Sequence, residues 1–360
     1  MSQQTVTAPI QASNGRLAAG TAITLLTAAA GLAYVKWIPS YAKALTALSH
    51  HTLGGSIVSG MASAPPALGL AAAWQYALAY YGLIWQALAL ALVLGASVQV
   101  LVPRRWIHRL FGRDDFRSIA IAGAFSLGGM MCTCCTAPIA LGLRRQHASA
   151  GSAMALLLGN PVLNPAVLFF IAAVLGWQLM LVRLLVGIAL VFGVATLANR
   201  WFPQPRDMRI EDAPIENARE SGWDLMRDWL KLLWWEIYTI LPGYIAIVFL
   251  LGAARAWLFT PHLTLAGGGI FMLIGLAVVG TLFVIPTAGE IPIVQTLMSF
   301  GLSTAAAAVL LITLPAISLP SLYIVRSAFP RRLLATAMGA VAVAGLIAGA
   351  AVSLLPNLRG

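Results

Sequence analysis

The sequence predicts an all-α polytopic membrane protein with a duplicated core, and three observations lead to that prediction. Hydrophobic residues make up 60% of the 360 residues and charged residues only 9%, which leaves too little polar surface for a water-soluble fold. The apolar residues form long runs rich in Ala, Leu and Gly, which suit membrane helices of about 20 residues and not the short alternating strands of a barrel. Proline-containing interruptions recur in both halves of the chain.

The uninterrupted apolar runs predict the spans. They lie at 17–37, 74–102, 177–197, 235–259, 265–285 and 333–355, and each is long enough as a helix to cross a hydrocarbon core of about 30 Å. The interrupted segments add further helices, so we expect about 8–10 membrane segments in all. Arg183 lies near one end of its run, so we expect its side chain to extend toward the lipid headgroups and to have a structural role.

The basic residues are informative about topology. The formal net charge is +11, but these residues gather in the connections between apolar runs, which indicates membrane orientation and not nucleic-acid binding. The segment RRWIHRLFGRDDFR holds five arginines against two aspartates. We therefore place this loop in the cytoplasm and expect the protein in a bacterial inner membrane.

Composition divides the chain into four parts. The N-terminal spans and the basic loop occupy 1–117, a first core repeat 118–198, a polar linker 199–231 and a second core repeat 232–360. Near the end of the linker, apolar residues recur at helical spacing opposite charged ones, as in a helix that lies at the membrane surface. A simple extension of the following span predicts the same pattern.

The proline interruptions indicate the duplication. Setting Pro138 over Pro292 gives an offset of 154 residues (292 − 138 = 154). The same offset aligns two further pairs, Pro161 with Pro315 and Thr133 with Thr287. Proline frees helix carbonyls that lipid cannot satisfy, and matched broken helices are typical of transporters whose binding site lies near the bilayer midplane. We expect proline-broken or re-entrant helices in an inverted repeat, with a parallel repeat as the alternative.

All the cysteines of the chain stand in one motif, MMCTCCTAP, as Cys132, Cys134 and Cys135. On a broken helix this spacing can direct three sulfurs at one soft atom, such as Cu(I), zinc, or trivalent arsenic or antimony. Apolar packing is the alternative role for a membrane cysteine. We expect the three to bind a soft metal ion, a metalloid or a sulfur-containing solute.

Glu290 is the second candidate. It is the only acidic residue between Glu236 and the C-terminus, and it stands in PTAGEIP between apolar runs. A carboxylate inside the membrane is costly and is functional by default, so we expect Glu290 to exchange protons, with a structural glutamate paired to arginine as the alternative. The polar side chains near the breaks are further candidates for substrate binding: Asn160, Asn164, Ser318, Thr133, Thr136 and Thr287.

These residues favour transport over catalysis. The sequence contains no G-x-x-x-x-G-K-[ST] phosphate loop, so we expect no ATP hydrolysis, no enzymatic activity and no cofactor. The leading hypothesis is a proton-coupled secondary transporter that exports a soft, thiol-reactive solute. The alternative is a membrane thiol-disulfide oxidoreductase that uses Cys132 and Cys135, which is disfavoured because the second half contains no cysteine.

Four segments, CTCCTAPIALGL, LLLGNPVLNPAVLFF, IPTAGEIPI and LPAISLPSL, resemble the predicted permeases of the ArsP and YraQ type. The resemblance covers roughly 118–170 and 282–329. It implies a permease in which the motif of Cys132, Cys134 and Cys135 handles a metalloid, since some members export trivalent organoarsenicals. The usual motif of that family has the form C-x-C-G, and Cys135 replaces the glycine.

Overall fold

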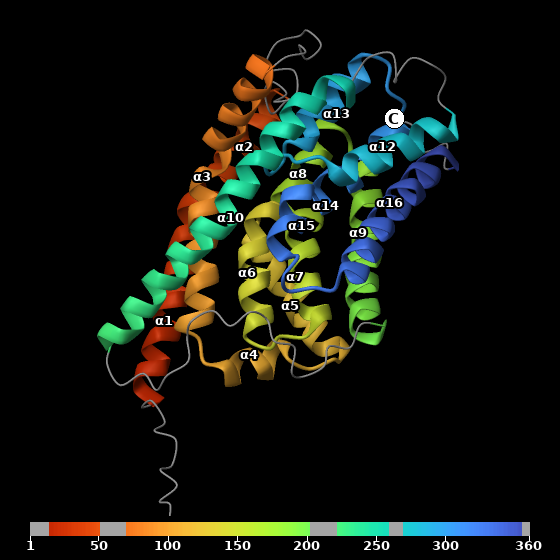
Figure 1. Ribbon diagram of the computed structural model, residues 1–360. Coiled ribbons are helices and arrows are strands. Elements are labelled where there is room, and N and C mark those ends of the chain that lie inside the picture. Colours follow the sequence, from red (N-terminus) through yellow and green to blue (C-terminus); the bar gives the residue numbers. More distant parts are fainter. Residues whose placement is uncertain (1–13, 51–69, 202–221, 259–268, 355–360) are drawn as a thin grey trace, which may run out of the picture.

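The computed structural model describes residues 14–50, 70–201, 222–258 and 269–354 (Figure 1). Within these ranges the chain forms helices joined by short connections and contains no β-strand, which confirms the all-α fold. Seven helical segments there are long and apolar enough to cross a membrane. Two helical hairpins accompany these spans, as described below.

The first span is longer than predicted. Helix α1 (Asn14–Leu32) continues through one π-helical turn, η1 (Ala33–Trp37), into α2 (Ile38–His50), whereas the prediction ended at residue 37. Helix α3 (Leu70–Val100) crosses in the opposite direction, and the short helix α4 (Arg104–Phe111) lies across its end (Figure 1). Helix α4 buries its apolar face and exposes its arginines, which suits a helix at the membrane surface.

Helices α5 (Phe116–Gly129) and α6 (Thr133–Arg145) form a re-entrant hairpin, here called hairpin 1. The 14 residues of α5 span about 21 Å, too short for a hydrocarbon core of about 30 Å. Helix α5 begins next to α4, and the chain returns there after α6, where the Ser149 amide donates to the Phe111 carbonyl at 2.7 Å. The tip of hairpin 1 is the turn 130–132, in which Met130 has a φ of 47°.

After hairpin 1 the chain forms two helices separated by a break, followed by one continuous helix. Helix α7 (Ala150–Val162) ends at a break, and the Asn164 side chain caps the start of α8 (Pro165–Val174) by accepting from the amides of Ala166 and Val167. Helix α9 (Trp177–Trp201) returns across the bundle. Helix α10 (Gly222–Leu258) is continuous and takes in the end of the predicted linker. That segment is therefore an extension of the span and not a separate surface helix, while 202–221 lie outside the described residues.

The second half repeats this arrangement from the other side. Helices α12 (Ile270–Leu282) and α13 (Glu290–Ser299) form hairpin 2, whose tip at 283–289 contains Ala288 with a φ of 65°. Helices α14 (Thr304–Ala316), α15 (Leu319–Val325) and α16 (Arg331–Leu354) follow. Helix α13 lies at the end of the bundle opposite α4 (Figure 1), so the two hairpins enter from opposite sides.

The helix starts reproduce the offset found in the sequence. Helix α12 starts 154 residues after α5 (270 − 116 = 154), and the same holds for α14 after α7, α15 after α8 and α16 after α9. The packing corresponds as well, because α5 packs on α7 and α9 while α12 packs on α14 and α16. The duplicated core is confirmed, and the opposite entry of the hairpins makes the repeat inverted.

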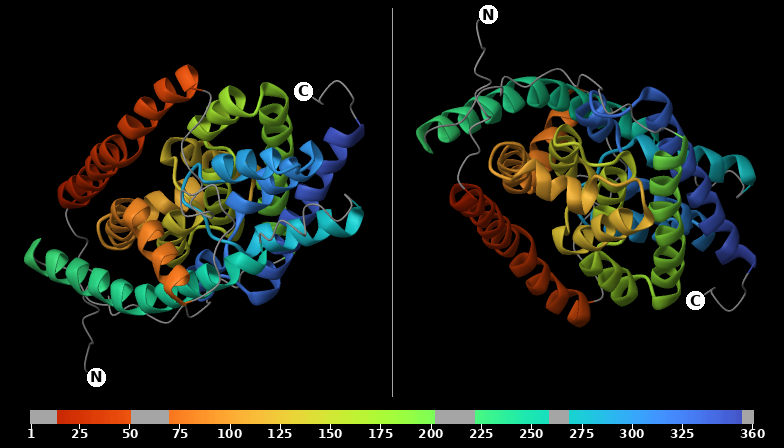
Figure 2. Two further views of the ribbon diagram at one scale, coloured as in Figure 1. Left: turned by 90° about the horizontal axis from the view of Figure 1, so that it is seen from above. Right: turned by 90° about the horizontal axis from the view of Figure 1, so that it is seen from below.

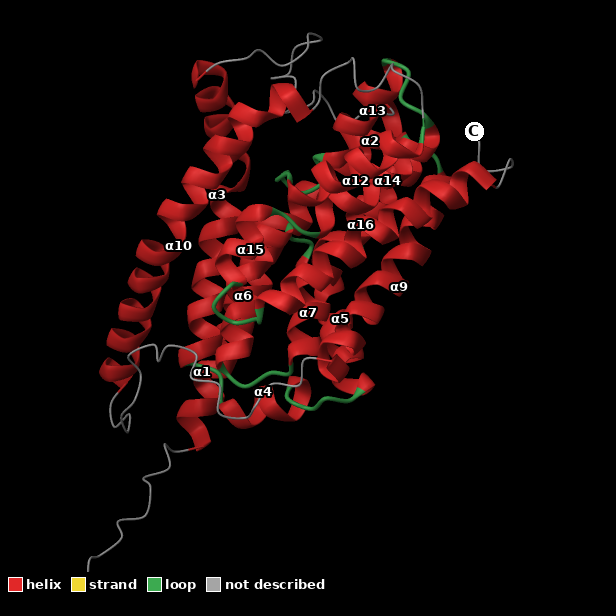
Figure 3. Cartoon of the chain, turned by 45° about the vertical axis from the view of Figure 1, so that its right-hand side comes forward, coloured by secondary structure: helices red, strands yellow, loops and turns green. Residues whose placement is uncertain are grey.

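The surface and the interior suit a membrane. The first span lies at the rim of the bundle (Figure 2), with only 11% of its apolar window buried, and large apolar side chains such as Leu26, Leu185 and Phe271 are exposed where lipid would cover them. Non-helical backbone also lies at mid-height inside the bundle (Figure 3). Such backbone is tolerated at membrane depth only where protein or a wet cavity surrounds it, so these breaks mark the region of the site.

Candidate functional site at the hairpin tips

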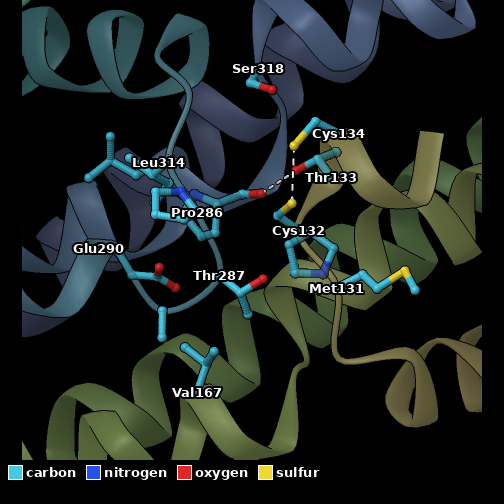
Figure 4. A pocket seen from close by; sticks show the side chains of 14 residues that line it. Met131, Cys132, Thr133, Cys134, Val167, Pro286, Thr287, Glu290, Leu314 and Ser318 are labelled. Carbon is cyan, nitrogen blue, oxygen red and sulfur yellow. Dashed lines mark hydrogen bonds between the residues drawn. The ribbon is translucent and has the colours of Figure 1, made fainter. Parts of the chain in front are cut away.

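One cavity is lined by the tips of both hairpins and by the breaks that follow them (Figure 4). Hairpin 1 contributes Cys132 and Cys134, hairpin 2 contributes Thr287 and Glu290, and Ser318 comes from the break after α14. The volume open to the centre of a water molecule is about 10 Å³, which is room for about one water. In this conformation the site therefore suits a single small atom or group.

The three thiols converge at the start of α6. Cys132 precedes the helix and Cys134 and Cys135 lie in its first turn, where residues three apart face each other. The Cys132 Sγ lies 3.0 Å from the Sγ of Cys134 and 3.0 Å from that of Cys135. All three sulfurs lie within 4.8 Å of one another, and no disulfide joins them.

This spacing is close to that of a three-sulfur ligand set. Two sulfurs bound to one ion at about 2.3 Å lie at most about 4.6 Å apart. The three thiols are therefore brought close enough to bind one soft atom after small side-chain shifts. Thiolate sulfur prefers soft metals and metalloids over hard cations. A bound soft atom is thus the chemistry that this cluster fits.

Two tyrosines extend the thiol cluster. The Tyr80 hydroxyl lies 3.3 Å from the Cys134 Sγ and 2.9 Å from the Tyr244 hydroxyl, and both side chains are fully buried. Tyr80 comes from α3 and Tyr244 from α10. This pair could not be predicted from the sequence, because a tyrosine in an apolar run gives no indication of its partner.

Glu290 is paired inside the membrane, which is the alternative that the sequence left open. Its Oε1 accepts a hydrogen bond from Nη1 of Arg183 at 2.8 Å, and both side chains are 1% exposed. The prediction that Arg183 extends toward the headgroups is wrong, because α9 packs in the bundle core and turns this side chain toward hairpin 2. A buried charge persists when it is paired and hydrogen-bonded, and this pair meets that condition.

Arg183 also holds the two helix breaks. Its guanidinium donates to the Pro161 carbonyl at 2.8 Å, the Val162 carbonyl at 3.2 Å and the Leu311 carbonyl at 3.1 Å. The Leu311 carbonyl is the one that Pro315 leaves without its helical donor, because proline has no N–H. One side chain of the first repeat thus satisfies carbonyls in both repeats and neutralises Glu290.

Two threonines at equivalent positions contact different partners. The Thr133 hydroxyl donates to the Pro315 carbonyl at 2.5 Å, which ties hairpin 1 to the second repeat. The Thr287 hydroxyl accepts from the Lys36 ammonium at 3.0 Å. Lys36 was also missed, although a single lysine inside an apolar span is the kind of signal that could have identified it.

The remaining predicted residues bond backbone beside the cavity. The Thr136 hydroxyl donates to the Cys132 carbonyl at 3.1 Å, and the Asn160 Oδ1 accepts from the Met131 amide at 3.3 Å. Asn164 caps α8, as described above. These three residues support the hairpin tip and the break, and they are not among the side chains that line the cavity.

The far end of hairpin 1 is anchored by a second buried polar group. The Gln99 side chain donates to Oε1 of Glu236 at 2.7 Å and accepts from Arg145 at 3.1 Å. Arg145 also lies over the Trp235 ring, with 4.6 Å from its Cζ to the ring centroid. Helix α6 therefore carries the thiols at one end and is held to α3 and α10 at the other.

Comparison with known proteins gives one family and two relatives. The family model described as predicted permease matches residues 70–354. The chain is 46% identical over 330 residues to the UPF0718 protein YraQ of Escherichia coli, covering 91% of this chain and 93% of that protein. It is 20% identical over 327 residues to a UPF0718 protein of Methanocaldococcus jannaschii, covering 73% and 90%. No solved structure matches.

Proposed function

Because the chain belongs to the predicted permease family, we propose that it is a secondary transporter for a soft, thiol-reactive solute, such as a trivalent arsenical or a soft metal ion. One observation carries this proposal: three free thiols and a buried ion pair line or adjoin one cavity at the tips of two oppositely entering hairpins. Sites between inverted repeats are where secondary transporters bind substrate.

The thiols supply reversible binding. When a thiol meets an arsenic atom that carries a hydroxyl, an S–As bond forms and the thiol proton leaves with the hydroxyl as water. Water or another thiol reverses the step by attacking the bound atom, as in thiol exchange. Cys132, Cys134 and Cys135 are the ligands in this proposal. Three ligands allow stepwise capture and release, because each bond breaks separately.

The ion pair supplies the coupling step. A proton taken up by the Glu290 carboxylate removes the negative charge that attracts Arg183. The guanidinium keeps its three carbonyl partners, so the contact that weakens is the one between α9 and hairpin 2. Protonation thus frees hairpin 2 from the first repeat, which is the movement that alternating access requires. We propose Glu290 as the coupling residue on this basis.

The direction proposed is export from the cytoplasm. The arginines of α4 and of the end of α6 lie at the end of the bundle where hairpin 1 enters, and positive loops face the cytoplasm. The thiol-bearing hairpin then enters from the cytoplasmic side of a bacterial inner membrane. A soft toxic solute would reach the thiols from that side and leave past hairpin 2.

The oxidoreductase alternative has less support. Thiol-disulfide exchange requires a partner thiol to reach the attacked sulfur. Cys132 is 6% exposed, Cys134 1% and Cys135 0%, and they lie within the bundle. A protein partner would need the hairpin to leave the bundle, whereas a small solute needs only a widening of the cavity.

Transport in everted inner-membrane vesicles tests the proposal. We expect uptake of arsenous acid, whose arsenic carries three exchangeable hydroxyls, to need a proton gradient. Its uptake should fall at least tenfold in Cys132→Ser, Cys134→Ser and Cys135→Ser, because oxygen is a poor ligand for a soft atom. Glu290→Gln should lower transport more than it lowers binding of the same probe to purified protein.

The result depends on folded protein in every vesicle. Membrane levels and thermal unfolding of each variant provide that control, and the Cys→Ser changes are nearly isosteric. Uptake by all three serine variants at the wild-type rate would remove the thiols from the mechanism. Equal transport by wild type and Glu290→Gln would remove the coupling role.

A further inference from the structure

Lys36 is an ammonium in the first membrane span that reaches the site. It lies in the π-helical turn η1, within a span that runs from Ala19 to Ser49, and its Nζ donates to the Thr287 hydroxyl at 3.0 Å. Thr287 lines the cavity from hairpin 2, and its side chain is half-buried. A charged group at membrane depth is costly and usually has an identifiable partner.

The same turn contacts both hairpins. The next residue, Trp37, donates from its indole nitrogen to the Gly128 carbonyl at 3.0 Å, and Gly128 lies two residues before the tip of hairpin 1. A π-helical turn inserts one residue into an α-helix and is frequently found at functional sites. Here it turns two consecutive side chains toward the tips of opposite repeats. The turn therefore places Lys36 against Thr287, beside the cavity.

The charges around the cavity do not balance. Glu290 is neutralised by Arg183 at 2.8 Å, and the Thr287 hydroxyl is uncharged. Among the described residues, the ion pairs within 4.0 Å involve Arg113, Arg145 and Arg183 and do not include Lys36. Lys36 is therefore an ammonium with no carboxylate within 4.0 Å among the described residues. An anionic group on the bound solute would balance it.

We propose that Lys36 selects solutes that carry a negatively charged group in addition to the thiol-reactive atom. The thiols bind the soft atom from hairpin 1, while the Lys36 ammonium, presented beside Thr287, forms a charge-assisted hydrogen bond with the anion. This inference rests on the proposed function and narrows its substrate class to soft electrophiles with an anionic substituent.

Three probes of similar size test the inference in everted vesicles. They are phenylarsine oxide, its 4-carboxamide, which is polar and neutral, and its 4-carboxylate, which is anionic at neutral pH. Wild type should transport the carboxylate with the highest kcat/KM. Lys36→Met should lower kcat/KM for the carboxylate roughly tenfold or more, as the loss of a hydrogen bond to a charged group predicts, and should change the neutral probes less than about threefold.

Two variants provide the controls. Lys36→Arg keeps the charge and should retain the preference. Lys231→Met removes an exposed lysine of α10, near the end of the bundle where Glu236 anchors hairpin 1, and should leave all three rates unchanged. Two outcomes would overturn the role of Lys36 and leave the proposed function standing. One is transport of all three probes by wild type with equal kcat/KM, and the other is an equal loss for all three in Lys36→Met. Absence of transport of every probe by wild type would instead overturn the proposed function, and the inference with it.

Discussion

At the scale of single residues, Arg183 has the largest set of interactions in the site. Its guanidinium joins a carboxylate and three carbonyls that proline breaks leave exposed. Arginine suits this position because its planar group donates in several fixed directions, whereas a lysine ammonium is a compact charge on a flexible stem. The pair therefore holds both helix breaks, and it includes the carboxylate on which the proposed coupling step depends.

Removing one member of the pair should cost more than removing both. Arg183→Met leaves Glu290 buried without its cation, so we expect a loss of about 3–5 kcal/mol in unfolding free energy. The double variant Arg183→Met with Glu290→Gln should recover part of this loss. Thermal unfolding in detergent, followed by tryptophan fluorescence, compares the three proteins. A double variant less stable than Arg183→Met would show that the two side chains do not compensate each other.

At the scale of helices, the hairpins depend on close packing against the helices that follow them. A Cβ on Gly159 would lie 2.3 Å from Oγ of Ser126, and a Cβ on Gly280 would lie 2.2 Å from Oγ1 of Thr313. These pairs are equivalent at the offset of 154 residues, with the glycine on opposite helices (280 − 126 = 154 and 313 − 159 = 154). Each repeat therefore keeps one small residue at the same crossing, as membrane helix interfaces commonly do.

A large residue at this crossing should displace hairpin 1. Gly159→Leu would force α5 away from α7, and we expect a loss of about 1–3 kcal/mol from overpacking. Gly193→Leu is the matched control, because a Cβ at Gly193 meets nothing within 4 Å. The apparent melting temperature in detergent measures both changes. Equal melting temperatures for the two variants would mean that the hairpin does not depend on this contact.

At the scale of the whole molecule, the inverted repeat predicts which surface each connection reaches. Helices α4 and α13 lie at opposite ends of the bundle (Figure 1). Arg105 belongs to α4, Ser299 is the last residue of α13, and both are exposed. A cysteine at either position should react with a membrane-impermeant maleimide from one side only. We expect Arg105→Cys to be labelled in everted vesicles and Ser299→Cys in intact spheroplasts. Labelling of both from the same side would contradict the inverted arrangement.

The native cysteines need not be removed for this experiment. They are buried, with Cys132 the most exposed at 6%, so the wild-type protein should give a low background. Wild type labelled under each condition measures that background directly. Everted vesicles opened with mild detergent should allow both introduced cysteines to react, which shows that each is accessible when no membrane separates it from the reagent.

Much of this architecture could be predicted from the sequence. Apolar run length located the spans, and two proline pairs were sufficient to find the offset that the helix starts reproduce, because proline breaks are local features. The pairing of Arg183 could not be predicted in the same way. The apolar run that contains Arg183 is the same whether this side chain extends to the headgroups or into the core. Only the packing of α9 against hairpin 2 decides between the two. The π-helical turn at Lys36 could not be predicted either, because the residue types around it do not distinguish a π-helical turn from an α-helical one.

The single ion pair between α9 and hairpin 2 has no twin in the other half. At the same offset, Thr136 stands where the second repeat has Glu290, and Ala337 stands where the first has Arg183. A carrier with two equivalent halves would rest equally well open to either compartment. In this protein only one half has such an ion pair, so the resting state is biased toward one of the two open conformations. Substitution of these two residues would change that bias and leave the three thiols as they are.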